Sequence, residues 1–387
     1  MKQKTITYLS TIKEEIFSLS QFVYKNKELP FKEKKTCEYI INLLKKFNFK
    51  VEKNFLNINT SFFAQIGEGH PKVCYICKYS ASKEGHIYGN NLNAAISIGC
   101  ALAMQNIISE IGGSITVVGC PGDNFNGAEL AIARENTFKD IDIIMCPHVY
   151  NETLESGTSC ALIPFEITFK SRKTSEEGEI SSSTLDACLL TFNILNSLIK
   201  NNNNLYSIDG LSINSLDGPY NLHPEASLRF YIRGNTLSNC ECLESSIKDI
   251  LKGLSNILNV DVYTHMFELP CRELLTNKSL SRVFSHNLKE CGIIDIDCCR
   301  NIPYGLSIGS ISHTTPCIYP SISICNSSED NIQFPSKEFE LLTLSDFAKS
   351  QCLKIIKSIC LTSIDIIERE DLLREMTIEM YDNKKSK

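Results

Sequence analysis

Strand-like apolar runs that alternate with helical segments constrain the fold of this chain most strongly. Residues 72–79 ("KVCYICKY"), 113–120 and 140–146 have the composition of buried strands. Between them, residues 91–111 are so rich in Ala, Gly and Ile that a helix there must be buried on most of its faces, and residues 128–138 form a second helical pattern. Strands and helices that alternate through short loops predict a mainly parallel sheet covered by helices on both faces.

The same pattern indicates where a ligand site would lie. In sheets of this kind ligands bind at the loops that follow the carboxyl ends of the strands. Three such ends are Tyr79-Ser80, residues 120–123 and residues 146–148. Residues 4–26 and 31–47 precede the pattern as two amphipathic helices. We therefore expect the candidate site residues in the three loops.

A second structural unit is expected after residue 162. Residues 163–272 have the order strand, helix, strand, strand, helix, strand, which is the split βαβ motif of a four-stranded α+β unit. A helix, a Gly- and Ser-rich segment, a strand and a long helix from about 338 to 368 then resume the first pattern. We predict a discontinuous α/β domain from residues 1–162 and 273–370, an inserted ferredoxin-like domain at 163–272, and a charged tail at 371–387, whose last residues, 379–387, are expected to fray.

Charge and composition exclude several classes of protein. The formal net charge is -6 and acidic and basic residues are interspersed, so no basic stripe favours a nucleic acid. The first 17 residues carry charges through their apolar positions, and no apolar run reaches the length of about 18 residues that a membrane helix needs. We predict a cytoplasmic protein that binds neither nucleic acid nor membrane.

The 18 cysteines raise the question of metal or redox chemistry. In a long chain without an export signal they are expected to be reduced thiols that mostly fill the core. Cys74 and Cys77 have the spacing of a zinc motif, but residues three apart in a strand point to opposite faces, so we interpret both as strand residues. A thiol nucleophile remains an alternative, with Cys146 beside His148 as its candidate.

Several strings resemble the aminoacylase, indole-acetyl-amino-acid hydrolase and aminobenzoyl-glutamate hydrolase family of two-zinc amidohydrolases, peptidase family M20. They are "NKELPFKE" at 26–33, "GHIYGNNLNAAISIGCALAM" at 85–104, "ITVVGCPGDN" at 115–124, "YNLHPEASLRFYIR" at 220–233 and "TPCIYPSISI" at 315–324. The resemblance implies a zinc-peptidase-like α/β domain with an inserted dimerisation or lid domain. It also implies a homodimer, or a heterodimer with an active relative, formed through the insert.

The metal-ligand motifs of that family are degenerate in this chain. By resemblance, the family's five ligand positions fall on Tyr88, Asn90, Asn124, Pro147 and Pro335. None of these is a normal zinc ligand, because zinc takes thiolate, imidazole or carboxylate groups. The family's general base falls on Asp123, the catalytic candidate here, and a family aspartate falls on Ser80.

The resemblance also implies substrate contacts from the inserted domain. A substrate-facing histidine of the family falls on Ser175, and an asparagine of the family is kept as Asn221. Arg233 closes a strand, where it either orients a carboxylate or amide of the substrate or is a solvated charge.

Two functions remain open at this point. In the first, the protein has lost its two-zinc site, needs no cofactor, and binds a small amide, acyl-amino acid or dipeptide or pairs with an active relative. In the second, it is a working amidohydrolase or dipeptidase with zinc or another divalent metal in a rebuilt site. His86, Asp123 and His148 are the candidate ligands of that rebuilt site. We favour the first function, because five replaced ligands should abolish the metal site.

Overall fold

The computed structural model describes residues 1–123, 127–172, 183–200, 205–215, 224–326 and 332–385. The chain divides into two compact units. Unit 1 comprises Met1–Thr158, Leu275–Asn301 and Ser310–Lys387, and unit 2 comprises Ser159–Leu274 and Ile302–Gly309. Each unit has a hydrophobic core of its own.

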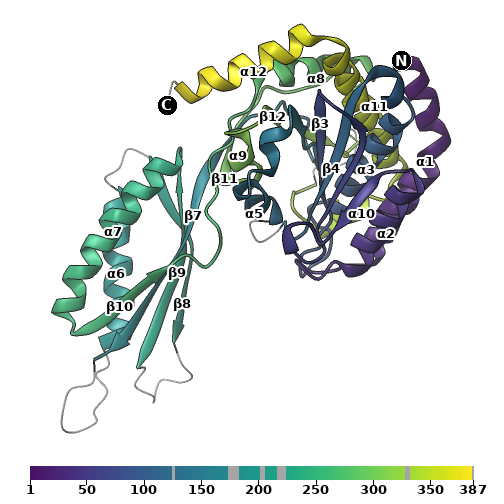
Figure 1. Cartoon of the computed structure of the whole chain (residues 1–387). Coiled ribbons are helices and arrows are strands. Elements are labelled where there is room, and N and C mark those ends of the chain that lie inside the picture. The colour runs from purple at the N-terminus through teal and green to yellow at the C-terminus, as the bar shows by residue number, and fades with distance from the viewer. Residues whose placement is uncertain (124–126, 173–182, 201–204, 216–223, 327–331, 386–387) are drawn as a thin grey trace. The chain divides into compact units, whose positions relative to one another are not determined.

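Unit 1 is built on a six-stranded sheet (Figure 1). In sheet order its strands are β1 (Lys50–Lys53), β2 (Phe62–Glu68), β4 (Gly113–Cys120), β3 (Lys72–Lys78), β5 (Ile143–Met145) and β12 (Cys317–Ile318). The strands β4, β3, β5 and β12 pair in parallel, as the sequence predicts, whereas β1 and β2 add an antiparallel edge. The sequence pattern did not reveal β2, because its apolar residues are interrupted by Gln65 and Gly67.

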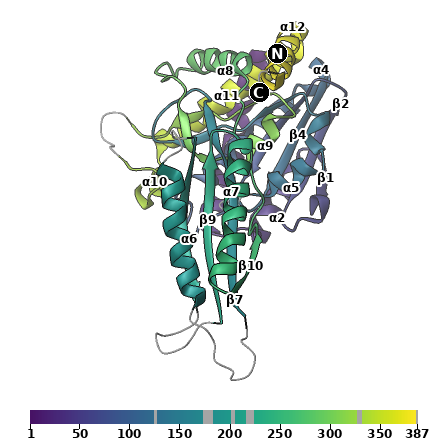
Figure 2. The same ribbon diagram turned by 90° about the vertical axis from the view of Figure 1, so that its left-hand side faces the viewer.

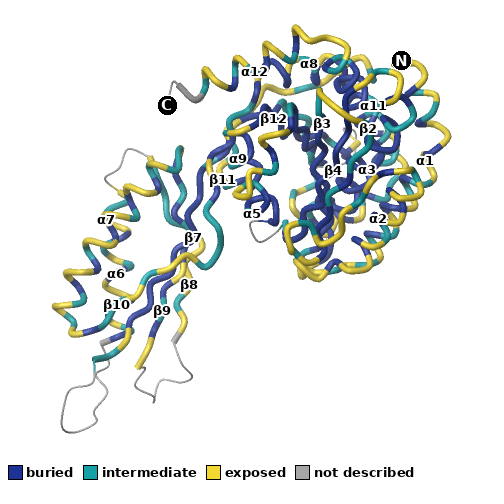
Figure 3. The backbone as a smooth tube through the Cα atoms, in the orientation of Figure 1, coloured by how far each residue is buried: buried dark blue, intermediate teal, exposed yellow. Residues whose placement is uncertain are grey.

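The helix α3 (Asn90–Gln105) is the central helix of unit 1. It packs on β3 and β4, and α1 (Lys2–Lys25) and α11 (Asp346–Glu368) pack against it. Every residue of α3 except Gln105 is buried, which confirms the prediction from its composition (Figure 3). Gly99 permits this close packing, since a Cβ atom there would lie 2.6 Å from Ile356 Cδ1 of α11.

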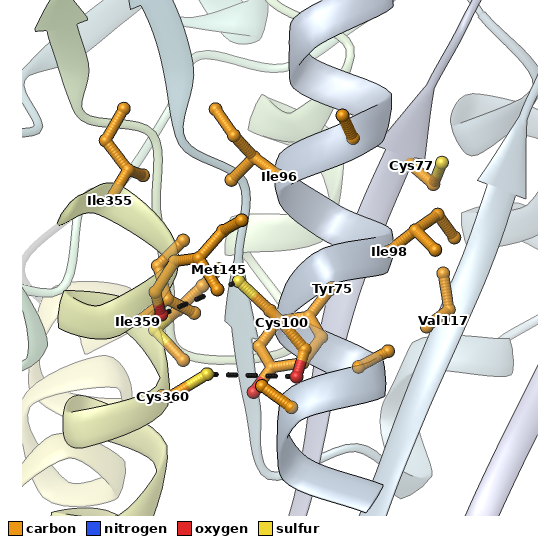
Figure 4. Packing of buried hydrophobic residues seen from close by; sticks show 14 of the residues in the cluster. Tyr75, Cys77, Ile96, Ile98, Cys100, Val117, Met145, Ile355, Ile359 and Cys360 are labelled. Carbon is orange, nitrogen blue, oxygen red and sulfur yellow. Dashed lines mark hydrogen bonds between the residues drawn. The ribbon is translucent and has the colours of Figure 1, made fainter. Parts of the chain in front are cut away.

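Thiols and one tyrosine fill the interface between α3, β3 and α11. Cys360 of α11 donates to the backbone oxygen of Cys100 in α3 (Figure 4). Tyr75 of β3 hydrogen-bonds Ser363 of α11 at 2.7 Å. All 18 cysteines are free, and most are buried. Cys74 and Cys77 are fully buried within β3, in agreement with the interpretation of both as strand residues.

The remaining helices of unit 1 differ from the prediction in two places. They are α2 (Lys34–Lys46), α4 (Ile108–Ile111), α5 (Ala128–Arg134), α8 (Lys278–Glu290), α9 (Ile308–Ser312, which begins in unit 2), α10 (Lys337–Leu342) and α12 (Glu370–Lys385). The predicted long helix is broken into α10 and α11, because the Ser345 side chain caps α11 by accepting from the Ala348 N–H. The segment from residue 379 that was expected to fray instead continues the helix α12 as far as Lys385, and its Met380 is buried. None of the helices among the described residues could cross a membrane.

Unit 2 confirms the split βαβ motif (Figure 2). Its elements are β7 (Thr158–Ser171), α6 (Ser183–Lys200), β8 (Tyr206–Ser215), β9 (Glu225–Gly234), α7 (Leu237–Ile257) and β10 (Val260–His265). The antiparallel sheet has the strand order β10-β7-β9-β8, and the short β11 (Asn301–Gly305) also pairs with β7. The helices α6 and α7 pack on the sheet over alternate residues such as Phe165 and Phe230.

Candidate functional site

A buried lysine lies between two carboxylates at the carboxyl ends of β3 and β4. Lys78, the last residue of β3, places its Nζ 2.6 Å from Asp123 Oδ1 and 3.0 Å from Glu129 Oε1. Asp123 follows β4 and Glu129 lies in the first turn of α5, so three separate elements supply the charges. The side chains of Lys78, Asp123 and Glu129 are only 7%, 13% and 0% exposed. We call these three residues the Lys78 centre.

A chain of amide side chains connects the Lys78 centre to His148. Asn90, the first residue of α3, donates to Asp123 Oδ2 at 3.0 Å, and its own Oδ1 accepts from Asn93 one turn later. Asn93 also donates to His148 Nδ1 at 2.8 Å and accepts from the Val149 N–H. Because Nδ1 of His148 is an acceptor, the network assigns the proton of its neutral ring to Nε2.

A third buried carboxylate, Glu33, organises the loop between β4 and Asp123. Ser80 donates to Glu33 Oε1 at 2.5 Å and accepts from the Gly122 N–H at 2.8 Å. Glu33 also accepts from the Gly122 N–H and from Thr60 Oγ1. Ser80, which stands at an aspartate position of the resembled family, therefore hydrogen-bonds the loop and ties it to Glu33.

Aromatic rings surround His148. Its ring stacks on Tyr319 at 5.5 Å between centroids and meets Phe334 edge-on at 5.6 Å. Tyr88 and Tyr150 also meet Phe334, at 5.9 and 4.4 Å. Tyr88 is half-buried, and burial, together with the Asp123 carboxylate, raises the pKa of its hydroxyl.

The charges of the Lys78 centre stabilise one another. Burial alone raises the pKa of Asp123, but the Lys78 ammonium and the Asn90 amide hold it below its usual range. Burial likewise lowers the pKa of Lys78, yet the Asp123 and Glu129 carboxylates hold it well above its usual range. Burial lowers the pKa of His148 to about 4, although Asp123 acts in the opposite direction. At neutral pH this is a site with an ionised Asp123, a charged Lys78 and a neutral His148.

The structure does not bring the proposed ligands of a rebuilt metal site together. Asp123 and His148 lie near each other, but the buried His86 bonds the backbone oxygen of Val23 in α1 through its Nε2 at 2.9 Å. In the part of the chain that the structure describes, no group of three or more His, Cys, Asp or Glu side chains is arranged to hold a metal ion. The structure therefore places His86 apart from Asp123 and His148, because its ring is hydrogen-bonded to α1.

The described side chains also do not match the donors that a two-zinc site needs. Asn90 uses its amide in hydrogen bonds to Asp123 and Asn93, and Tyr88 keeps its proton at neutral pH. Pro147 and Pro335 have no donor atom in their side chains. Asn124 lies outside the described residues. The Lys78 ammonium adds a positive charge among these groups. This charge would repel a divalent cation that bound in the same place.

The predicted contacts from the insert are described only in part. Ser175 and Asn221 lie outside the described residues. Arg233 lies at the end of β9 in unit 2, where its Nη1 is 3.3 Å from Asp209 Oδ2 and donates to the backbone oxygen of Pro303. Arg233 Nε is buried and has no hydrogen-bond partner among the described residues.

The thiol alternative is disfavoured by burial. Cys146 is 4% exposed, and burial raises the pKa of its thiol to about 12, with the Lys78 ammonium acting in the opposite direction. A thiol that stays protonated at neutral pH is a poor nucleophile. Cys146 is therefore a core residue at the end of β5.

Three residues of this site were not identified from the sequence: Lys78, Glu129 and Glu33. A signal for Lys78 was present, since a charge at the carboxyl end of a strand lies where α/β sheets bind ligands. Glu129 and Glu33 are in helical or loop segments whose polar residues usually face solvent, and only the tertiary structure shows that both are fully buried.

Comparison with known proteins supports the resemblance stated above. No protein-family model matches the chain. Over 301 residues the chain is 23% identical to one of the subunits of p-aminobenzoyl-glutamate hydrolase from Escherichia coli. The alignment covers 70% of this chain and 61% of that relative, less than two thirds of the relative's length. Two solved structures share the fold. An aminobenzoyl-glutamate utilization protein from Klebsiella pneumoniae matches with a TM-score of 0.73 at 9% identity over 91% of this chain and 98% of its own.

The second structure is a dinuclear metal-binding peptidase of the M20 family from Bacillus subtilis. It matches with a TM-score of 0.66 at 13% identity, over 91% of this chain and 99% of its own. These identities are low enough that the two structures show the fold alone. The fold of this chain, an α/β domain with an inserted split βαβ unit, is that of the M20 peptidases and amidohydrolases, the family that its sequence resembles.

Proposed function

We propose that this protein has lost two-zinc catalysis and binds a small amide, acyl-amino acid or dipeptide at the loops after β3, β4 and β5. The observation that carries the proposal is the state of Asp123, which stands at the position of the family's general base. Both of its carboxylate oxygens are engaged, one by Lys78 at 2.6 Å and the other by Asn90 at 3.0 Å. A carboxylate with a lowered pKa and two strong donors is a weak base for water or an amide.

Similarity to a p-aminobenzoyl-glutamate hydrolase supplies a first probe for the ligand. The aromatic rings of Tyr88, Tyr150 and Phe334 form a cluster that contacts His148 through Phe334, and the neutral His148 ring carries a donor at Nε2. Such a combination suits an aromatic acyl group attached to an amide. The alternative function is an active metal-dependent amidohydrolase or dipeptidase that hydrolyses an acyl-amino acid or dipeptide amide bond with a rebuilt metal site.

We expect the purified protein to contain no stoichiometric zinc and to bind p-aminobenzoyl-glutamate without hydrolysing it. Elemental analysis after dialysis against zinc measures the metal content. Calorimetry measures the binding of p-aminobenzoyl-glutamate, and the release of product over hours measures its hydrolysis. The matched control is Asp123→Asn, which removes the carboxylate charge at nearly constant volume. Equal, background-level hydrolysis by the wild type and Asp123→Asn supports the proposal. Chelator-sensitive hydrolysis that Asp123→Asn abolishes would establish the alternative.

We also propose that the protein forms a homodimer, or a heterodimer with an active relative, through the inserted unit. Among the described strands of unit 2, β8 is the last of its sheet, a position at which a second chain can add a strand. Leu189 and Leu190 of α6, which packs next to β8, are 46% and 40% exposed. Exposed leucines beside an open strand edge are typical of an interface between protomers.

Light scattering coupled to size exclusion is expected to show a dimer at micromolar concentration, and Leu189→Lys/Leu190→Lys is expected to weaken it at least tenfold. Ile257→Lys is the control, because Ile257 is 77% exposed at the end of the other helix, α7. A heterodimer predicts a monomer that forms a 1:1 complex when an active relative is added. A wild-type monomer that forms neither complex, or a dimer that Ile257→Lys disrupts equally, would contradict this interface.

A further inference from the structure

The Lys78 centre holds more negative than positive charge. One ammonium faces two carboxylates, and the Glu33 carboxylate lies close by, on the other side of Ser80 and Gly122. Glu129 and Glu33 are fully buried and Asp123 nearly so. Buried carboxylates remain ionised only where cations or strong hydrogen-bond donors compensate for the lost water. A cation at this place is therefore a requirement of the fold.

The position of the ammonium matches that of a bridging cation. Lys78 Nζ contacts one oxygen of Asp123, from the loop after β4, and one oxygen of Glu129, from α5, so it connects two elements with the end of β3. The centroid of the Tyr319 ring lies 5.8 Å from the same Nζ, within the range of a cation–π contact. A lysine that acts as a nucleophile needs a lowered pKa, whereas both carboxylates stabilise the charged form here.

We propose that Lys78 is a tethered cation that takes the structural place of a bound metal ion, joining β3, the loop after β4 and α5 through Asp123 and Glu129 and leaving the centre no need for a divalent ion. This inference deepens the proposed function and rests on it in one respect: both treat the chain as having no two-zinc centre. It names the group that replaces the metal ion. It also gives the reason why this loop cluster stays folded without a metal ion.

The test compares two lysines of the same strand. Lys78→Met removes the buried ammonium and keeps most of the side chain's length. Lys72→Met is the matched control, because Lys72 lies at the other end of β3 and pairs with Asp140, whose side chain is 71% exposed. Thermal unfolding of the full-length protein is measured with a chelator and with zinc added. Removal of one partner of a buried pair is expected to lower the Tm by about 6–10 °C for Lys78→Met. Lys72→Met, which breaks an exposed pair, is expected to lower it by at most about 2 °C.

A triple variant keeps the proposal testable if Lys78→Met does not fold. In Lys78→Met/Asp123→Asn/Glu129→Gln the two carboxylate charges are removed together with the ammonium, so at least half of the lost Tm is expected to return. Wild-type Tm is expected to change by less than 1 °C, about the error of the measurement, with chelator or zinc. Three results would overturn the proposal: a zinc-dependent rise in wild-type Tm that the chelator reverses, equal effects of Lys78→Met and Lys72→Met, or a triple variant as unstable as Lys78→Met. Hydrolysis by the wild type would refute the proposed function but is not measured by these Tm values.

Discussion

Acidification from pH 7 to pH 4 is expected to reduce the free energy of unfolding by about 3 kcal/mol through His86 alone. His86 is 1% exposed, and burial lowers its pKa from 6.5 to about 4, although its bond to the Val23 oxygen and the nearby Glu340 carboxylate act in the opposite direction. The positive charges of Lys27 and Lys337 lower the pKa further. The ring Nδ1 has no hydrogen-bond partner among the described residues, so a proton added there gains no acceptor.

The sign of this effect follows from proton binding in the two states. Because the folded pKa of His86 lies below the unfolded value, the unfolded chain binds more protons between pH 6.5 and pH 4. Stability therefore falls as the pH falls through this window, and the contribution of His86 becomes constant only well below pH 4, where both states are fully protonated. The His148 ring, whose pKa is also lowered to about 4, adds to the fall in the wild type.

Urea unfolding at several pH values measures the effect, and His86→Gln isolates it. The glutamine retains an N–H that can reach the Val23 oxygen but does not titrate, so the difference between wild type and variant should decrease by about 3 kcal/mol across the window. His286→Gln is the matched control, since His286 is exposed on α8. A His86→Gln protein with the full wild-type pH dependence would show that His86 is not buried in its neutral form.

Gly119→Ala is expected to destabilise the protein by about 3 kcal/mol or more, the upper part of the range for overpacked cores. Gly119 of β4 lies directly opposite Phe62 of β2, and a Cβ atom on it would lie 2.1 Å from the Phe62 ring. The ring has little room to move, because it is fully buried and stacks on Tyr79 at 6.1 Å. Gly119 also precedes the loop that carries Asp123, so the strain is expected next to the Lys78 centre.

A double-mutant cycle with Phe62→Leu tests the cause. The smaller side chain should accept the added methyl group, so Gly119→Ala/Phe62→Leu is expected to be at least about 1 kcal/mol more stable than the sum of the single changes. Gly253→Ala in α7 is the control for the same chemical change, because no atom lies within 4 Å of its Cβ position. That variant should be neutral or stabilising by up to about 1 kcal/mol. Additive effects of Gly119→Ala and Phe62→Leu in urea unfolding would exclude the contact with Phe62 as the cause.

Much of the fold could be predicted from the sequence, because the periodicity and composition of a segment reflect which of its residues are buried. The helix α3 was identified from its Ala, Gly and Ile content, and the split βαβ order of unit 2 from alternating residues such as Phe165 and Phe230. Errors arose where local sequence does not determine the outcome. The strand β2 contains a glycine and a glutamine, and α12 is ordered by contacts such as the bond from Asn277 to the Met376 oxygen, 99 residues away. These contacts are between distant segments, so no local pattern contains them.

The candidate site could likewise be predicted only in part from the sequence. The amino-acid sequence was enough to establish the fold class and to show that Tyr88, Asn90, Pro147 and Pro335 are not normal zinc ligands. It also predicted a site at the loops after β3, β4 and β5. The folded chain was needed to show that His86 bonds α1, and that Asp123 pairs with Lys78, 45 residues earlier in the chain. The sequence alone does not determine these contacts, because the role of a charged side chain depends on which other charged side chains are buried next to it. Distances of about 3 Å between segments from β3, β4 and α5 are set by the packing of the whole unit.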